Sequence, residues 1–96
     1  MLKVESIHHG IVIDHITQGK GKKIFDRLNL GEVDYPVVLL RNVPSSKYGK
    51  KDIIKIENCI DIDMTILGLI EPNATINIIE GERIIRKMKV EIPEEV

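Results

Sequence analysis

Apolar and polar residues alternate along much of this chain with the two-residue period of a β-strand. Between residues 51 and 57, Ile54 and Ile56 alternate with a second set that includes Lys55, so the two sets lie on opposite faces of a strand. Runs rich in β-branched residues predict further strands at residues 10–16, 33–41, 74–79 and 83–90.

The strand at residues 10–16 divides its side chains between two faces. Its period predicts Ile11 and Ile13 on one face. The other face is predicted to carry Val12, Asp14 and Ile16. In the strand at residues 33–41, the apolar run 37–40 predicts a segment that is buried on both faces of the sheet.

A helical period replaces this alternation between residues 17 and 30. Ile24, Phe25 and Leu28 fall on one stripe of that helix, and charged residues occupy most of the rest. Gly31 is expected to end the helix.

The segment Gly19-Lys20-Gly21-Lys22 resembles a phosphate-cradling loop only superficially, because the remaining residues of a P-loop are absent. Its glycines each weaken the first helical turn by roughly 1 kcal/mol, so we interpret it as a flexible helix start. A second, shorter helix is predicted at residues 64–69, with Asp61 and Asp63 as candidate N-caps.

The predicted order of elements is β-α-β-β-α-β followed by a terminal strand. This order is typical of an α+β protein with a ferredoxin-like plait, in which an antiparallel sheet carries two helices on one face. The other face must then be solvated or paired with another molecule.

Composition narrows the class of protein. The 96 residues suffice for one domain, and 43% hydrophobic with 30% charged residues is typical of a soluble globular protein. A net charge of −1 argues against a nucleic-acid-binding module. No apolar run reaches the roughly 18 to 20 residues of a membrane span, and the single cysteine, Cys59, fits the cytoplasm.

Residues for catalysis or metal binding are sparse. The three histidines match no zinc-ligand spacing. His15 follows Asp14 directly, but no nucleophile, base and orienting group form a recognisable set. We therefore predict that the chain is not an enzyme and binds no metal.

Lys51 and Lys55 lie on one face of their strand. Four residues at roughly 3.3 Å each separate them by about 13 Å, which is near the length of an extended nucleoside triphosphate. Lysines on the outer face of a strand are also ordinary solubilising residues that discourage edge pairing. Taken alone, the two lysines favour this solubilising interpretation, because lysine is mostly a surface residue.

Four segments carry a resemblance to a known family. They are Val12-Ile13-Asp14-His15-Ile16, Asn42-Val43-Pro44-Ser45, residues 49–58 from Gly49 to Asn58, and residues 72–77 from Pro72 to Asn77. These segments resemble the nucleotide-binding domain of the aspartate carbamoyltransferase regulatory chain. The resemblance implies an allosteric domain at residues 1–90, followed by an acidic tail or linker stub at residues 91–96.

In that family, CTP inhibits and ATP activates a separate catalytic chain of pyrimidine biosynthesis. The resemblance implies which residues of this chain would form the nucleotide site. Near the base and ribose it implies Ile7, Val12, Asp14 and Lys55, with Asp14 toward the ribose and Lys55 at both. At the phosphates it implies Lys51, His15 and Lys87. Along the remaining wall it implies Asn77, Ile79 and Ile84.

Two features depart from the family pattern. Glu82 stands where the family tends to place an aromatic residue beside the base, which leaves the preference between CTP and ATP open. Family members also continue past the position of residues 92–95 into a four-cysteine zinc domain that docks on the catalytic chain. We therefore expect no zinc site and little contact with a catalytic chain here, but a homodimer like those of the family.

A second class of function is compatible with the same residues. A small non-enzymatic protein on the same plait could self-associate through its sheet edge or face and bind no nucleotide. Thermal melting with CTP or ATP separates the two hypotheses, because a ligand that binds only the folded state raises its stability.

Overall fold

The computed structural model describes residues 9–47, 49–58, 61–81 and 83–89. In chain order its elements are β1 (His9–Thr17), α1 (Lys20–Arg27), the 3-10 helix η1 (Leu30–Glu32), β2 (Val37–Ser45), β3 (Gly49–Glu57), α2 (Met64–Ile70), β4 (Thr75–Glu80) and β5 (Arg83–Lys89). The strands form one antiparallel sheet in the order β2-β3-β1-β4-β5.

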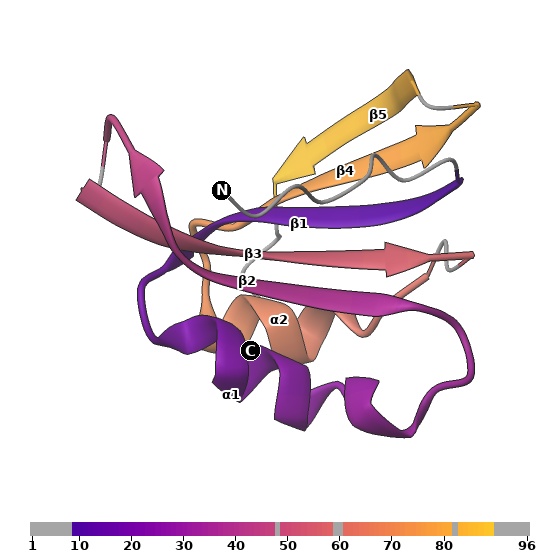
Figure 1. Cartoon of the computed structure of the whole chain (residues 1–96), viewed down its shortest axis with the longest axis horizontal. Coiled ribbons are helices and arrows are strands. Elements are labelled where there is room, and N and C mark those ends of the chain that lie inside the picture. The colour runs from indigo at the N-terminus through magenta and orange to yellow at the C-terminus, as the bar shows by residue number, and fades with distance from the viewer. Residues whose placement is uncertain (1–8, 48, 59–60, 82, 90–96) are drawn as a thin grey trace, which may run out of the picture.

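Both helices cover the same face of this sheet (Figure 1). The predicted ferredoxin-like plait is therefore confirmed, with β5 added as an edge strand beside β4. We call the opposite face, which none of the described helices covers, the helix-free face.

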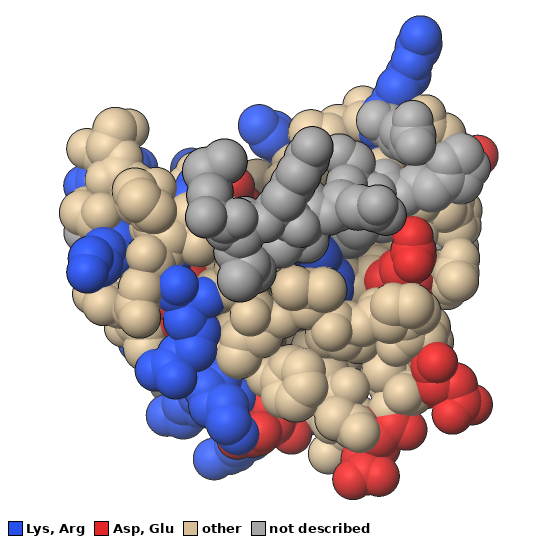
Figure 2. Space-filling view, viewed as in Figure 1, with Lys and Arg blue, Asp and Glu red and all other residues tan. Residues whose placement is uncertain are grey.

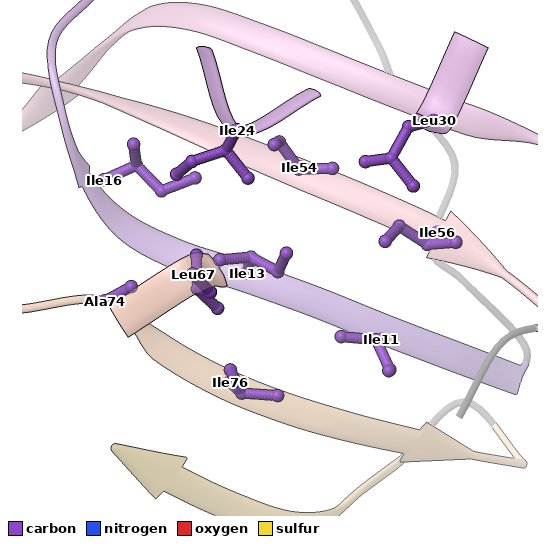
Figure 3. Close-up of a cluster of buried hydrophobic side chains, with 10 residues drawn as sticks. All are labelled: Ile11, Ile13, Ile16, Ile24, Leu30, Ile54, Ile56, Leu67, Ala74 and Ile76. Carbon is purple, nitrogen blue, oxygen red and sulfur yellow. The ribbon is translucent and has the colours of Figure 1, made fainter. Parts of the chain in front are cut away.

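Isoleucine side chains from the central strands fill the space between the sheet and the helices (Figure 3). The buried cluster consists of Ile11, Ile13, Ile16, Ile24, Leu30, Ile54, Ile56, Leu67, Ala74 and Ile76. Isoleucine suits a strand that faces the core. Its β-branched side chain favours the strand conformation, and its burial contributes roughly 1.5 to 3 kcal/mol to stability. This core fixes which side chains of each strand remain for the helix-free face.

The prediction that Ile16 shares a face with Val12 and Asp14 is wrong. Ile13 pairs with Ile54 across the sheet, whereas Ile16 pairs with Asp52, so two residues of β1 oppose a single residue of β3. This β-bulge restarts the alternation and returns Ile16 to the core. The bulge contains His15, whose φ of 59° lies in the left-handed region.

The prediction that residues 37–40 are buried on both faces is also wrong. β2 forms an edge of the sheet, and all four of these residues are only half-buried. Val37 and Leu39 pack against the core, while Val38 and Leu40 alternate with them and lie on the other face. The edge position also accommodates Pro44, which lacks an N–H for a second neighbouring strand.

The first helix ends earlier than predicted. Leu28 donates the last helical hydrogen bond, to Ile24, and Asn29 then adopts a left-handed φ of 54°. Asparagine tolerates this conformation and can replace glycine at a helix end. Gly31 lies within η1 and does not end the helix.

Asp52 of β3 organises the start of α1. Its side chain is fully buried, and its carboxylate accepts hydrogen bonds from the backbone amides of Gly19 (3.0 Å), Gly21 (3.0 Å) and Asn42 (3.2 Å). A Cβ on Gly21 would lie 2.8 Å from the Asp52 side chain, so this glycine allows the helix to approach the sheet. The acidic group therefore caps α1 from a neighbouring strand, at the end where the helix dipole favours negative charge.

The second helix agrees with its predicted cap. The Asp63 carboxylate accepts hydrogen bonds from the amides of Thr65 (3.0 Å) and Ile66 (3.1 Å), so Asp63 is the N-cap residue. No helix in the described ranges is long and apolar enough to cross a membrane.

We expect Asp52→Ala to lower the free energy of unfolding by about 3 kcal/mol, because buried amides that lose their acceptor each cost roughly 1 to 3 kcal/mol. Urea denaturation followed by circular dichroism measures this change. The exposed Asp26→Ala on α1 is the matched control and should change stability by less than about 0.5 kcal/mol. Equal effects of the two substitutions would contradict the capping role.

Candidate functional site

Four of the predicted site residues form one row across the helix-free face. Val12 of β1 pairs with Lys55 of β3 on one side and with Asn77 of β4 on the other. Asn77 in turn pairs with Lys87 of β5. At about 4.8 Å between neighbouring strands, the Cα atoms of the two lysines are about 14 Å apart. The row therefore has a cation at each end and an apolar and an amide side chain between them.

The rows on either side of this one differ in chemistry. Two residues away in one direction, Gly10 pairs with Ile79, and Ile79 pairs with Ile84. Two residues away in the other direction, Asp14 pairs with Thr75. The surface thus changes from apolar to polar over four residues, or about 13 Å.

Asn77 lies at the centre of this surface with an unused acceptor. The residue is only 6% exposed, and its Oδ1 atom has no hydrogen-bond partner in the described part of the chain. An unsatisfied buried polar atom costs roughly 1 to 3 kcal/mol, and such atoms are few in native proteins. A ligand with an N–H group at this point would satisfy it.

Asp14 and Lys51 form an ion pair at the polar end of the surface. Lys51 Nζ lies 3.0 Å from Asp14 Oδ1, and the two side chains are 16% and 22% exposed. The same oxygen accepts a 2.6 Å hydrogen bond from the His15 amide. Burial by itself raises the pKa of the Asp14 carboxyl, but the Lys51 and His15 hydrogen bonds and charges together lower it below its ordinary value.

His15 is held by the neighbouring strand. Its Nδ1 atom lies 3.0 Å from the Thr75 hydroxyl of β4. The bulge in β1 thus points the two side chains to opposite neighbours. Asp14 contacts Lys51 of β3, and His15 contacts Thr75 of β4. β-bulges often re-aim side chains beside functional sites, and this one separates two residues that are adjacent in the sequence.

A small pocket that the sequence analysis does not predict adjoins His15. We call it the Lys89 pocket. It has a volume of about 170 Å³ and is lined by His15, Lys47, Asn73, Thr75 and Lys89. Lys89 lies two residues beyond Lys87 on β5, so strand alternation places both on the helix-free face. That alternation is visible in the sequence and could have identified Lys89.

The remaining predicted residues differ in how exposed they are, and some lie outside the described residues. Ile79 is buried, while Ile84 beside it is 57% exposed. Ile7 and Glu82 lie outside the described residues, as does the predicted tail at residues 91–96. The structure therefore brings nine of the predicted residues onto one face of the sheet.

Basic residues also gather on the helix side of the molecule, over α1 (Figure 2). They are the exposed side chains of Lys20, Lys22, Lys23 and Arg27. The amides of Gly19 and Gly21 at the start of this helix already donate to Asp52, which agrees with the interpretation that this segment is not a phosphate-binding loop. Lys22 is paired with Asp26 of its own helix, at 2.7 Å.

A second cavity, of about 280 Å³, lies at the other end of α1. Its lining residues are Arg27, Leu28, Asn29, Leu30, Tyr35, Asp61, Ile62, Asp63 and Ile66. None of them belongs to the predicted nucleotide site, so this cavity does not help to define it.

The lowered pKa of Asp14 predicts how stability depends on pH. Because the folded-state pKa lies below the ordinary value of 3.8, the stabilisation is fully present above pH 3.8 and is lost as the pH falls through the folded-state pKa. Lys51→Met removes the main partner, so this variant should lose less stability than the parent over that acid range. Denaturant melts at a series of pH values measure the difference.

Lys22→Met, which breaks the exposed pair with Asp26, provides the control for this measurement. Its acid dependence should follow that of the parent. Identical pH profiles of the parent and the Lys51→Met variant would show that Lys51 does not determine the ionisation of Asp14.

Comparison with known proteins gives a consistent result. The family model described as "aspartate carbamoyltransferase regulatory chain, allosteric domain" matches residues 2–91. A chain of that name from Clostridium tetani is 61% identical over 97 residues, which cover 100% of this chain and 67% of the relative. The chain from Clostridium botulinum strain Hall is 57% identical, covering 97% and 64%. That from Pyrococcus abyssi is 44% identical, also covering 97% and 64%.

This chain spans about two thirds of the length of these curated relatives. The matches are named as regulatory chains, which confirms the prediction that the chain is not an enzyme. Given the agreement of fold, sequence and coverage, the chain belongs to the family of aspartate carbamoyltransferase regulatory chains and corresponds to their allosteric domain.

Proposed function

We propose that the helix-free face binds an effector nucleotide, CTP or ATP, through which this domain regulates aspartate carbamoyltransferase in pyrimidine biosynthesis. The observation that carries the proposal is the row Lys55, Val12, Asn77 and Lys87. It combines two cations with a buried, unused amide acceptor. Solubilising lysines alone would not require a buried polar atom between them.

The chemistry of the face supports one orientation of the nucleotide. The apolar residues Val12, Ile79 and Ile84 suit the base, and the polar end around His15 suits the phosphates. Cytosine and adenine each carry an exocyclic amino group that donates hydrogen bonds, which matches the unused Oδ1 of Asn77. Uracil presents a carbonyl at the corresponding position, so this arrangement favours CTP over UTP.

The other charged residues complete the binding site. Asp14 accepts hydrogen bonds and lies two residues from Val12 on β1, where it suits a ribose hydroxyl. Lys51 forms an ion pair with Asp14 and can contribute charge to the phosphates, as can Lys87 on β5. Lysine acts as a compact charge in such contacts and need not match the phosphate geometry.

Calorimetric titration and thermal melting with CTP and ATP test this proposal. Nucleotide at about 100 times its dissociation constant should stabilise the parent protein by roughly 2.7 kcal/mol. Lys55→Ala and Lys87→Ala should each weaken binding by more than about 1 kcal/mol, the scale of a charge-assisted hydrogen bond. Their stability without ligand should change little.

The control for these variants is Lys22→Ala on α1, on the opposite face of the domain. Lys89 is unsuitable as a control because it lines a pocket with His15. Weakening by Lys22→Ala equal to that by Lys55→Ala would refute the site. No stabilisation by either nucleotide would favour the alternative of an interaction protein without a nucleotide ligand.

We also propose that the domain takes part in the regulation of aspartate carbamoyltransferase, the enzyme that the names of its relatives mention. Such regulation requires the nucleotide to interact differently with two states of the assembly. Because this chain has a single cysteine, typical of a protein from a reducing compartment, we infer that it works in the cytoplasm.

We infer in addition that the domain forms a homodimer. Among the described strands, β2 and β5 have only one neighbour each, and unpaired strand edges favour association. β5 also exposes 57% of Ile84 and 58% of Ile85. Light scattering should give a mass twice the 10.9 kDa of one chain. The mass of a single chain at tens of micromolar protein would contradict the dimer.

A further inference from the structure

The helix α2 is short and contributes little to the core. It spans seven residues, fewer than the roughly 12 to 15 at which an isolated helix becomes marginally stable in water. Leu67 is its one fully buried apolar side chain (Figure 3), whereas Leu69 is 73% exposed. Gly68 at its centre lowers its helical propensity further. The stability of α2 therefore depends on contacts with the rest of the domain.

The carboxyl-terminal end of α2 is tied to the segment that joins β1 to α1. The Glu71 carboxylate accepts hydrogen bonds from the Thr17 amide, at 2.7 Å, and from the Asn73 amide, at 3.3 Å. Lys20 Nζ donates a hydrogen bond to the Ile70 carbonyl, at 3.2 Å. We call the two contacts that reach another element, Glu71–Thr17 and Lys20–Ile70, the α2 clamp. The clamp fixes α2 to β1 and α1 through one carboxylate and one ammonium group.

The position of Glu71 makes the clamp costly to close. The residue is 1% exposed, and it lies at the carboxyl-terminal end of a helix, where the dipole disfavours negative charge. A carboxylate can accept about four hydrogen bonds, but Glu71 accepts two from the described residues and forms no ion pair with them. A buried charge with too few partners is unfavourable. Opening of the clamp returns this carboxylate to water and recovers part of that cost.

Asp52, which is also fully buried, is better satisfied than Glu71. It accepts three amide hydrogen bonds, and it lies at the amino-terminal end of α1, where the dipole favours its charge. Its own strand, β3, is paired on both sides. The attachment of α1 to the sheet is therefore stronger than that of α2, so α2 is the helix that separates first.

We propose that α2 opens from the sheet as a unit while the five strands stay paired, and that Glu71 controls this opening. Burial of Leu67 and the α2 clamp favour the closed state, whereas hydration of Glu71 and the conformational freedom of the segment favour the open one. Allosteric regulation requires an element with two arrangements, and α2 supplies one within the domain. The inference concerns the protein without ligand, so it does not depend on nucleotide binding.

Native-state hydrogen exchange, followed by NMR on the full 96-residue chain, tests this proposal. The amides of Leu67 and Glu71 donate helical hydrogen bonds to the carbonyls of Asp63 and Leu67, so their exchange reports the opening of α2. In the parent protein they should exchange about tenfold or more faster than the amides that pair β1 with β3, because a local opening requires less free energy than global unfolding. Low urea concentrations should accelerate the strand amides more strongly, because global unfolding exposes more surface.

Two substitutions separate the local opening from global unfolding. Ile56→Val weakens the core beneath β3, at a position drawn apart from Leu67 in Figure 3. It destabilises the sheet whether α2 is closed or open, so it should speed exchange of the strand amides about threefold and leave the α2 amides unchanged. Glu71→Ala destabilises the closed state relative to both the open and the unfolded states, so it should speed the α2 and strand amides alike, about tenfold.

Further variants examine the clamp itself. Glu71→Gln keeps a carbonyl acceptor for the Thr17 amide, so its α2 exchange rates should lie between those of the parent and Glu71→Ala. Lys20→Met removes the second contact of the clamp and should speed the α2 amides about two- to fivefold. Glu32→Ala removes an exposed carboxylate from η1 and should leave all rates within about twofold of the parent.

Two results would overturn the inference. Equal exchange rates of the α2 and strand amides in the parent, or acceleration of the α2 amides by Ile56→Val, would show that α2 opens only when the whole domain unfolds. Unchanged α2 rates in Glu71→Ala would show that Glu71 does not control the opening. If Glu71→Ala does not fold, the parent, Ile56→Val and Lys20→Met decide between the same outcomes. Fast α2 exchange that Ile56→Val leaves unchanged and the clamp variants accelerate supports the proposal.

Discussion

The buried carboxylate of Asp52 connects α1 to the strands β2 and β3, and the positions of these elements determine the rest of the fold. It accepts hydrogen bonds from amides in the β1–α1 connection, in α1 and in β2, so three separate stretches of chain depend on one side chain of β3. A buried charge is costly unless it is fully hydrogen-bonded. These amides supply the bonds, and the requirement in turn fixes where α1 starts and where β2 bends.

Two irregular points of the sheet, one in the central strand β1 and one in the edge strand β2, lie beside Asp52. β1 bulges at Asp14 and His15, opposite Ile53, and β2 bulges at residues 41–42. Bulges strengthen the local twist and redirect side chains. On the helix side the β1 bulge returns Ile16 to the core, and on the helix-free face it separates Asp14 from His15. The same irregularity thus serves the stability of one face and the chemistry of the other.

The sequence predicts those features that depend on regular periods. Alternation around Ile54 and Ile56 and the order of elements were sufficient for the plait. The family resemblance supplied the row from Lys55 to Lys87, which no period reveals because its members come from four strands. The errors at Ile16, residues 37–40 and Gly31 share a physical cause. A bulge places Ile16 in the core, an edge position exposes residues 37–40, and a left-handed asparagine ends the helix before Gly31. Tertiary contacts determine these three features, and the local sequence pattern does not reveal them.

A second buried carboxylate, that of Glu71, holds the two chain segments that carry His15 and Thr75. Glu71, at the end of α2, accepts hydrogen bonds from the amides of Thr17 at 2.7 Å and Asn73 at 3.3 Å. Thr17 lies two residues after His15, and Asn73 two residues before Thr75, so Glu71 ties both partners of the His15–Thr75 contact to the helix layer. These bonds connect the His15–Thr75 contact on the helix-free face to the end of α2 in the helix layer. A ligand bound at His15 would alter the helix layer through them only if it bound two arrangements of these bonds with different affinities.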